Sequence, residues 1–315
     1  MGSKPRILFM GTPDFAVPSL NSLLGAGYPL LGVVTQPDKP RGRGRQMACS
    51  PVKALALEKG IDCLQPARVR EPSFREAFRA LAPDLVVVAA FGQILPREIL
   101  EEPPRGCINV HPSLLPRYRG AAPINWTLIR GEAVTGVTIM RVDEGVDTGD
   151  MLLQTETPVG QNETYDQLHD RLALLGADLL LQAVQSLEAG TVTPRPQDDA
   201  LATHAPRLTR EDGRIDWRGP SEAIARLVRG LSSVPGAYTT VEGRMLKVFM
   251  ATSRPGPVSD PPGAVGVFSP QGLPVAAGDG LVFLTDVQLE GKKRMSIGEF
   301  LRGYRLREGQ CLGAS

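Results

Sequence analysis

Short apolar runs alternate with helical patterns through the N-terminal half of the chain, and this alternation restricts the fold more than any other feature. Five runs have the length and composition of buried strands: 6–10, 30–35, 85–90, 106–111 and 137–142. Helical patterns lie between them, at 17–24, 51–59, 73–81 and 122–130. Strands that alternate with helices form βαβ units around a parallel sheet. We therefore predict an α/β fold with a Rossmann-like, doubly wound parallel sheet.

A second domain is predicted after the longest helical pattern, residues 164–188, which Gly190 ends. Residues 191–207 are rich in proline and lack periodicity, as a linker would be. One further helical stretch, 221–231, is followed by short β-rich segments that glycine and proline separate: 237–241, 246–251, 263–268 and 280–284. We expect residues 1–190 and 208–315 to be separate domains, the second an OB-like β-barrel.

The composition points to an intracellular location. No run of about 18 apolar residues is present, and residues 1–6 lead into a predicted strand without the apolar region of a signal peptide. The 4 cysteines form no CxxC pair, which fits a reducing compartment. We expect a cytoplasmic protein with no membrane partner.

The net charge of +1 is unevenly distributed. Residues 207–315 hold 15 basic and 11 acidic side chains, a balance of +4, whereas residues 1–206 hold 20 and 23, a balance of −3. A basic C-terminal part is compatible with a polyanionic partner, although so small an excess also arises by chance.

The first predicted strand does not lead into a dinucleotide site. Such a site needs GxGxxG at this turn, but only Gly11 is present and Pro13 removes a phosphate-binding N–H. The sheet is therefore not expected to bind NAD.

Polar residues alternate along the predicted strand 106–111. Cys107, Asn109 and His111 share one face because successive side chains of a strand point to opposite sides. Asn109 and His111 are about 6.6 Å apart along the strand, close enough to serve one substrate atom, whereas Cys107 is about 13 Å from His111. His111 is one of only 3 histidines, so few others could act as an acid or base. Polar groups at the carboxyl end of a parallel strand are typical of ligand sites.

An acidic loop, residues 143–150, follows the next predicted strand. A carboxylate from it could reach His111 and favour the imidazolium form. An amide and an imidazolium together suit a developing oxyanion, as in acyl transfer without a covalent nucleophile. A simple Asp- and Gly-rich turn or a cation site is the alternative for this loop.

Several motifs together match one enzyme family. They are Gly-Thr-Pro-Asp-Phe at 11–15, Thr-Gln-Pro-Asp-Lys-Pro at 35–40, Asn-Val-His at 109–111, Ser-Leu-Leu-Pro at 113–116, Arg-Gly-Ala-Ala-Pro-Ile at 119–124 and Asp-Thr-Gly-Asp at 147–150. The chain resembles the methionyl-tRNA formyltransferases, a branch of the 10-formyltetrahydrofolate-dependent formyltransferases. Pro112 departs from the pattern, because many members of the branch have glycine there.

The resemblance implies a one-carbon formyl transfer in translation initiation. The α-amine of methionine on initiator tRNA would attack the formyl carbon of 10-formyltetrahydrofolate, without a metal. Asn109 and protonated His111 would hold the oxyanion, and Asp147 would orient and charge His111. We expect the enzyme to act as a monomer.

The resemblance also implies binding residues. The folate site maps to Ser113, Leu114, Leu115 and Pro116, with Phe91, Gly92, Gln93 and Ile94 lining the pterin pocket. The tRNA contacts map to the basic loop at Arg41, Arg43 and Arg45, and to Lys292, Lys293 and Arg294 in the second domain. Residues 1–190 would be the catalytic domain and 208–315 the tRNA-binding domain. Flexible glycines between the arginines would let the guanidinium groups follow phosphates, and of these we expect most from Arg43.

Two other functions remain open. One is formyl transfer to a small amine, which would leave the basic second domain without a role. The other is a non-catalytic RNA-binding protein, which would not need Asn109, His111 and Asp147 together.

Overall fold

The computed structural model describes residues 4–41 and 46–313, and their contacts divide the chain into two compact units. Unit 1 comprises the chain up to Gly120 with Thr135–Thr157 and His169–His204, and unit 2 comprises Ala121–Val134, Pro158–Leu168 and the chain from Ala205. Residues 191–204, which the sequence predicts to be a linker, are grouped with unit 1.

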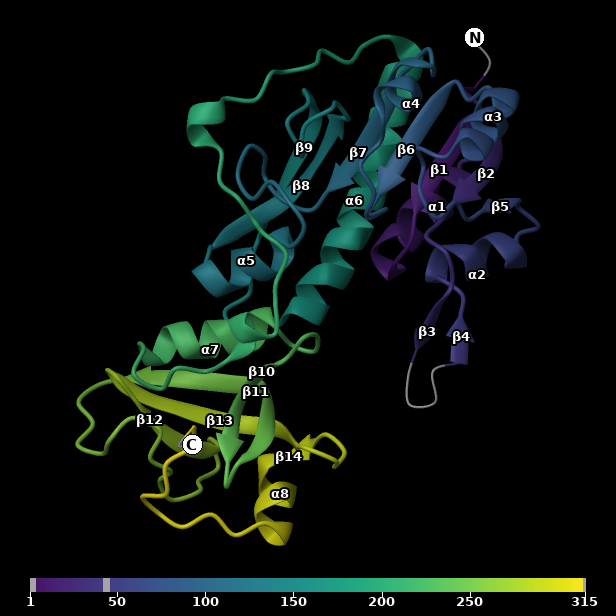
Figure 1. Ribbon diagram of the computed structural model, residues 1–315. Coiled ribbons are helices and arrows are strands. Elements are labelled where there is room, and N and C mark those ends of the chain that lie inside the picture. Colours follow the sequence, from purple (N-terminus) through teal and green to yellow (C-terminus); the bar gives the residue numbers. More distant parts are fainter. Residues whose placement is uncertain (1–3, 42–45, 314–315) are drawn as a thin grey trace. The chain divides into compact units, whose positions relative to one another are not determined.

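Unit 1 contains a seven-stranded sheet (Figure 1). Its strands are β1 (Ile7–Gly11), β2 (Leu30–Val34), β5 (Cys63–Leu64), β6 (Leu85–Ala89), β7 (Cys107–His111), β8 (Val134–Arg141) and β9 (Met151–Pro158). The order is β5-β2-β1-β6-β7-β8-β9. Neighbouring strands from β5 to β7 are parallel, and β8 is antiparallel to β7. From β1 the strand order runs through β2 to β5 on one side, and β6 and β7 follow on the other side of β1. The position between β1 and β6 is therefore the switch point, where doubly wound sheets bind ligands.

Helices follow most of these strands. They are α1 (Val17–Gly25), α2 (Pro51–Glu58), α3 (Pro72–Leu81), α4 (Arg97–Glu101), α5 (Pro123–Arg130) and α6 (Tyr165–Ala189), with 3-10 turns η1 (Asp14–Ala16), η2 (Asp199–Leu201) and η3 (Glu211–Gly213). The predicted strands and helices of this half of the chain are confirmed to within a few residues at each end.

Strand alternation divides the core of unit 1 between the two faces of the sheet. On one face, Leu8, Met10 and Val86 form a buried cluster with Phe74 and Phe78 of α3. The two phenylalanines of α3 are four residues apart, so both lie on the helical face that packs against the sheet. The predicted parallel α/β sheet is thereby confirmed, with helices packed on it.

α6 begins at a capping box and ends at a glycine. The Gln167 side chain accepts a hydrogen bond from Thr164 N at 3.0 Å, and Gly190 has a φ of 67°, which favours glycine. By length and hydropathy alone α6 could span a membrane. Its leucines at 168, 172 and 180 are fully buried in the protein, as in the core helix of a globular fold.

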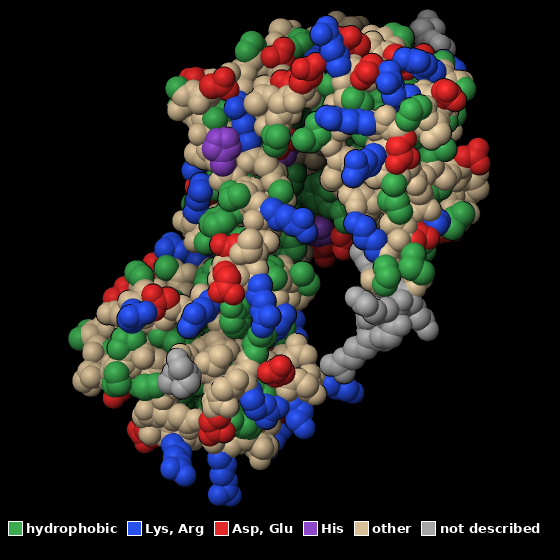
Figure 2. All heavy atoms as spheres, in the orientation of Figure 1, with side chains coloured by type: hydrophobic (Ala, Val, Ile, Leu, Met, Phe, Trp, Pro, Cys, Tyr) green, Lys and Arg blue, Asp and Glu red, His purple; other side chains and the backbone are tan. Residues whose placement is uncertain are grey.

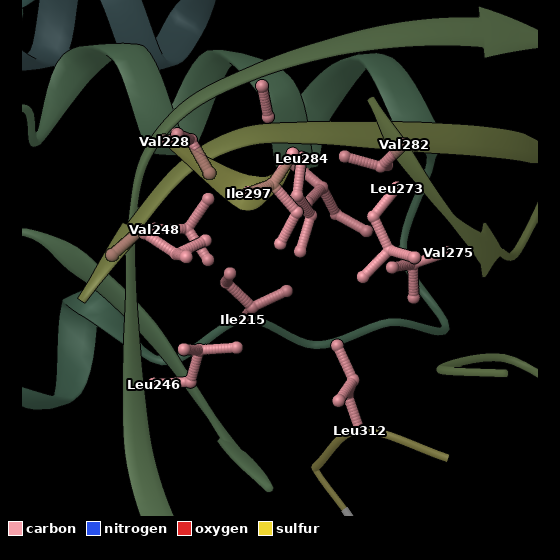
Figure 3. Close-up of a cluster of buried hydrophobic side chains, with 14 of the residues drawn as sticks. Ile215, Val228, Leu246, Val248, Leu273, Val275, Val282, Leu284, Ile297 and Leu312 are labelled. Atoms are coloured by element: carbon pink, nitrogen blue, oxygen red, sulfur yellow. The ribbon is translucent and has the colours of Figure 1, made fainter. Parts of the chain in front are cut away.

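Unit 2 is built around an antiparallel sheet that curls into a half-barrel (Figure 1). Its strands are β10 (Ala237–Val241), β11 (Arg244–Pro255), β12 (Leu273–Ala277), β13 (Gly280–Leu289) and β14 (Met295–Ser296). Its helices are α7 (Ser221–Gly230), α8 (Ile297–Gly303) and, from the Ala121–Val134 segment, α5. The order is β10-β11-β13-β12, with β14 on β13. The inward side chains of these strands meet Val228 of α7 and Ile297 of α8 in one core (Figure 3). The predicted second fold, an OB-like β-barrel, is confirmed as a β domain whose antiparallel sheet forms a half-barrel.

Some elements differ from the sequence prediction. Residues 263–268 form isolated bridges and no strand, because Gly263 has a φ of 92° and interrupts an extended backbone. A short hairpin, β3 (Lys39–Arg41) with β4 (Gln46–Ala48), was not predicted, because its strands are polar and lack apolar alternation.

Gly176 of α6 lies so close to β7 that a Cβ would stand 2.8 Å from Cγ1 of Val110. We expect Gly176→Val to lower the free energy of unfolding by about 1–3 kcal/mol, because stiff neighbours cannot yield. Gly25→Ala in α1 is the control, since no atom lies within 4 Å of its added Cβ. Chemical denaturation measures both, and equal stability of the two variants would contradict the close packing.

Candidate active site

β7 presents Asn109 and His111 on one face of the sheet and Val110 on the other. Val110 is 2% exposed and packs against α6, whereas Cys107 donates to the Ile99 carbonyl at 3.4 Å, beneath α4. Burial raises the pKa of the Cys107 thiol to about 12, so this thiol stays protonated and is no nucleophile. The strand therefore offers Asn109 and His111 for chemistry.

Two opposing groups fix the His111 ring. Its Nε2 is 3.0 Å from the carbonyl oxygen of Tyr118, and its Nδ1 is 3.6 Å from Oδ2 of Asp147. Because a carbonyl only accepts, Nε2 must carry a hydrogen. The second nitrogen, Nδ1, is then the one that faces the Asp147 carboxylate.

The Asp147 side chain is held in place by the loop after Tyr118. Gly120 N donates to Oδ2 of Asp147 at 2.8 Å, and the Asp147 backbone has a φ of 55°, in the left-handed region. Asp143 of the same acidic loop accepts instead from Gly145 N at 3.1 Å and from the Thr148 hydroxyl at 2.8 Å. Within the loop, Asp143 therefore forms the turn, and Asp147 is the carboxylate beside the histidine.

Asn109 is partly buried, between Val88 of β6 and Met140 of β8. Its amide makes no hydrogen bond to any residue that the structure describes. Two residues of strand separate it from His111, a rise of about 6.6 Å on the same face. An amide that makes no hydrogen bond to the described residues, next to a fixed imidazole, is a ready donor for a ligand oxygen.

The Ser113–Pro116 loop is fixed by two side chains from β8 and β9. The Thr138 hydroxyl accepts from Leu115 N at 3.2 Å and donates to the Ser113 carbonyl at 2.7 Å. Gln154 Nε2 donates to Thr138 Oγ1 at 2.8 Å and to the Leu115 carbonyl at 3.1 Å. Ser113 and Leu115 are buried, and Leu114 and Pro116 are half-buried. These hydrogen bonds therefore hold the loop that follows His111 in one conformation.

Residues 91–94 follow β6, at the switch point of the sheet. Phe91 is 2% exposed within the core, Gln93 accepts from Val69 N at 3.0 Å, and Ile94 is 59% exposed. Gln36 Nε2 donates to the Phe91 carbonyl at 3.1 Å and to the Gly92 carbonyl at 3.4 Å. This loop therefore turns the Ile94 side chain outward, while the Phe91 side chain supports it from within.

The basic loop is only partly described. Arg43 and Arg45 lie outside the described residues, as does the side chain of Arg41 at the end of β3. Lys53, the last basic residue of this run, contacts Asp38 at 2.6 Å and Gln65 at 2.7 Å. The hydrogen bond from Lys53 lowers the pKa of the Asp38 carboxyl, and Gln65 adds to it. Lys53 thus anchors the base of the hairpin.

The three basic residues of unit 2 differ from one another. Arg294 donates to Asp286 at 2.6 Å and stacks 4.4 Å from the Phe249 ring centroid, and the hydrogen bond to Asp286 raises its pKa. Lys292 and Lys293 are exposed in the turn before β14. Lys and Arg side chains are frequent on the face of unit 2 that Figure 2 shows. All three side chains are exposed, but among them only Arg294 is paired with a carboxylate within the described residues.

Sequence reasoning did not anticipate several groups of this site. They are the Tyr118 carbonyl, Gly120 N, Thr138, Gln154 and Gln197, which donates to the carbonyls of Asp147 and Gly149. Backbone groups carry no side-chain signal. Gln154 lies on a strand that was not predicted, and Gln197 lies in the segment expected to be a linker.

Residues 5–184 match a protein family described as formyl transferase, and residues 207–305 match its C-terminal domain. The chain is 56% identical to the methionyl-tRNA formyltransferase of Syntrophus aciditrophicus over 99% of this chain and 100% of that protein. It is 51% identical to that of Citrifermentans bemidjiense over 98% and 96%.

A solved structure of HypX from Aquifex aeolicus, in complex with tetrahydrofolic acid, resembles this fold with a TM-score of 0.67 at 20% identity. The alignment covers 95% of this chain and 47% of HypX, so the chain spans about half of that protein.

Thr138→Val removes the hydroxyl that forms hydrogen bonds with Leu115 N, the Ser113 carbonyl and Gln154. We expect the free energy of unfolding to fall by about 1–3 kcal/mol, because buried polar groups are left unsatisfied. Thr155→Val is the matched control, since the Thr155 side chain makes no hydrogen bond within the described residues. Chemical denaturation reports both. A Thr138→Val protein as stable as the control would remove Thr138 from this network.

Proposed function

Because this chain belongs to the formyl transferase family, we infer that it transfers the formyl group of 10-formyltetrahydrofolate to the α-amine of methionine on initiator tRNA. The enzyme is a methionyl-tRNA formyltransferase of translation initiation, with the formyl folate as its co-substrate. The identity of 56% along almost the whole chain carries this function. The observation that carries the assignment of residues is the His111 ring, held between the Tyr118 carbonyl and Asp147.

Asn109 and His111 stabilise the negative charge that develops on the formyl oxygen. The neutral amine attacks the formyl carbon, a C–N bond forms, and the carbonyl oxygen becomes an oxyanion. The Asn109 amide and the protonated Nδ1 of His111 donate to this oxygen. Donors fixed before the reaction act strongly in such a role, because they need no reorganisation when the charge appears.

Asp147 keeps His111 charged and assists proton transfer. As the tetrahedral intermediate collapses, the bond between carbon and N10 breaks, the amine nitrogen loses a proton, and N10 gains one. A water beside the Asp147 carboxylate is suited to carry that proton. The separation of 3.6 Å between Asp147 and Nδ1 is longer than a hydrogen bond, so the Nδ1 hydrogen stays available to the substrate oxygen while the ring keeps its orientation. Catalytic hydrogen bonds commonly tighten only when substrate is bound.

The folate binds at the edge of the sheet where the carboxyl ends of β6 and β7 lie. We assign the Ser113–Pro116 loop and residues 91–94 to it, since both follow strands whose carboxyl ends lie at the same edge. The Leu115 backbone is held in one position by its hydrogen bond to Thr138, and the exposed Ile94 side chain provides apolar surface for the flat pterin ring.

The tRNA contacts unit 2 and the basic loop. We assign Lys292 and Lys293 to its phosphates because their charges are exposed, with Arg294 fixing the turn through Asp286 and Phe249. Arg41, Arg43 and Arg45 would extend the contact toward the acceptor end. Residues 208–315 are accordingly the tRNA-binding domain. We also propose that the enzyme acts as a monomer in the cytoplasm, where charged tRNA and reduced folates are found.

The purified protein should formylate charged initiator tRNA with 10-formyltetrahydrofolate, measured as formyl-methionine. His111→Ala and Asn109→Ala should each lower kcat by about 100- to 1,000-fold, because each removes an oxyanion donor. The Kd for tRNA, measured by filter binding, should stay within about twofold, since neither residue faces the phosphates.

The same assay with small amines in place of tRNA is the control for substrate class. Turnover of a small amine without turnover of charged tRNA would overturn the acceptor assignment. Binding of tRNA without any turnover would show a non-catalytic protein, and a wild-type rate for His111→Ala would remove it from the mechanism.

Lys292→Ala combined with Lys293→Ala should weaken tRNA binding and lower the slope of log K against log salt by about 2, one for each lost phosphate contact. Lys59→Ala, an exposed lysine at the end of α2, is the control for general charge loss. Binding at several salt concentrations measures the slope. If the double variant and the control have the same slope, these lysines make no contact with RNA.

A further inference from the structure

The segment from Arg195 to His204 is fixed to unit 1 at both ends. Near its start, Arg195 and Met151 exchange backbone hydrogen bonds at 2.8 and 2.9 Å. Near its end, Arg119 N donates to the Thr203 carbonyl at 2.9 Å, and Tyr118 N donates to the Thr203 hydroxyl at 2.9 Å. We call residues 195–204 the return segment. Its end thus holds the loop whose Tyr118 carbonyl accepts from His111.

Gln197 in the middle of the return segment reaches the loop on the other side of His111. Its Nε2 donates to the Asp147 carbonyl at 2.9 Å and to the Gly149 carbonyl at 2.8 Å. Its Oε1 accepts from Arg119 Nε at 3.0 Å. Both carbonyls can only accept and the guanidinium can only donate, so these partners leave the amide one orientation.

Arg119 completes the connection between the two loops. Its side chain is 6% exposed, and its Nη2 donates to Asp199 Oδ1 at 2.7 Å, although the Asp199 side chain is 84% exposed. Arg119 lies between Tyr118, which binds Nε2 of His111, and Gly120, which donates to the Asp147 carboxylate. The Gln197 amide is therefore hydrogen-bonded both to Arg119, next to Tyr118, and to the Asp147 loop. It connects the groups that contact the two nitrogens of the His111 ring.

We propose that Gln197 is a positioning residue for Asp147. The Asp147 backbone has a φ of 55°, a conformation that non-glycine residues adopt only when their surroundings hold it. The two hydrogen bonds from Gln197 bracket this residue, at its own carbonyl and at that of Gly149. Without them the loop can relax to a negative φ, and the carboxylate leaves Nδ1. The inference rests on the proposed role of Asp147.

The close packing of Gly149 limits the conformations that the Asp147 loop can adopt. A Cβ on Gly149 would stand 2.0 Å from the Arg141 carbonyl, so this end of the loop lies directly on β8. Asp147 thus has a fixed strand on one side and Gln197 on the other. Gln197 is the only side chain of the return segment, within the described residues, for which the structure shows a hydrogen bond to this loop.

Two substitutions at Gln197 test the proposal. Gln197→Met keeps the length but removes all hydrogen bonding. Gln197→Glu keeps an acceptor for Arg119 but can no longer donate to the two carbonyls. Both should lower kcat by about 10- to 100-fold, because a small misplacement of a catalytic group has that effect. The KM values for formyl folate and tRNA should stay within about twofold. Leu201→Ala, a position of the return segment whose side chain is 61% exposed, is the control and should leave kcat unchanged.

A double-mutant cycle with Asp147→Ala separates positioning from general damage. If Gln197 acts through Asp147, Gln197→Met should lower kcat no further than about twofold in the Asp147→Ala background. Full additivity, or a wild-type kcat in both Gln197 variants, overturns the proposal. If Gln197→Met does not fold, judged by its melting curve, Gln197→Glu decides by the same criteria. A wild-type kcat for Asp147→Ala would instead overturn the proposed role of Asp147.

Discussion

The placement of the His111 imidazole is the constraint on which the rest of the site depends. A carbonyl holds one ring nitrogen and a carboxylate faces the other. Because the Tyr118 carbonyl can only accept a hydrogen bond, Nε2 must donate to it, and the ring has one orientation with Nδ1 facing the carboxylate. Asn109, two residues earlier on the same strand, then has a fixed relation to it. Neither group would form an oxyanion site if the ring could turn.

The fold supplies this placement through several layers. α6 packs against Val110, directly between the two polar residues of β7, so the strand cannot shift along the sheet. Thr138 and Gln154, from strands that lie beyond β7 in the sheet, hold the loop that follows His111. The carboxyl ends of β1, β6 and β7 meet at one edge, which gathers their loops around the site. The loops that follow these strands are thus fixed by the elements packed around them.

Charge on a sequence is not the same as charge on a surface. Arg294 was among the basic residues expected to meet RNA, yet it is hydrogen-bonded to Asp286, and Lys53 near the basic loop is likewise hydrogen-bonded to Asp38. Phe91 likewise lies in a motif expected to line a pocket, and its ring is part of the core. Asp286 lies 8 residues before Arg294 and Asp38 lies 15 residues before Lys53, so neither pairing can be recognised from adjacent residues alone.

The sequence by itself determined the α/β class, the common face of Asn109 and His111, and the family, because periodicity and motifs are properties of neighbouring residues. The resemblance named Asp147, but only the tertiary structure placed its carboxylate beside the histidine, with Asp143 bonded within its own turn, and only the structure returned residues 195–204 to unit 1. The Asp147 carboxylate reaches His111 across 36 positions of chain, and Gln197 reaches Asp147 across 50. Such pairings follow from how strands and loops pack in space, and that packing depends on the whole chain at once.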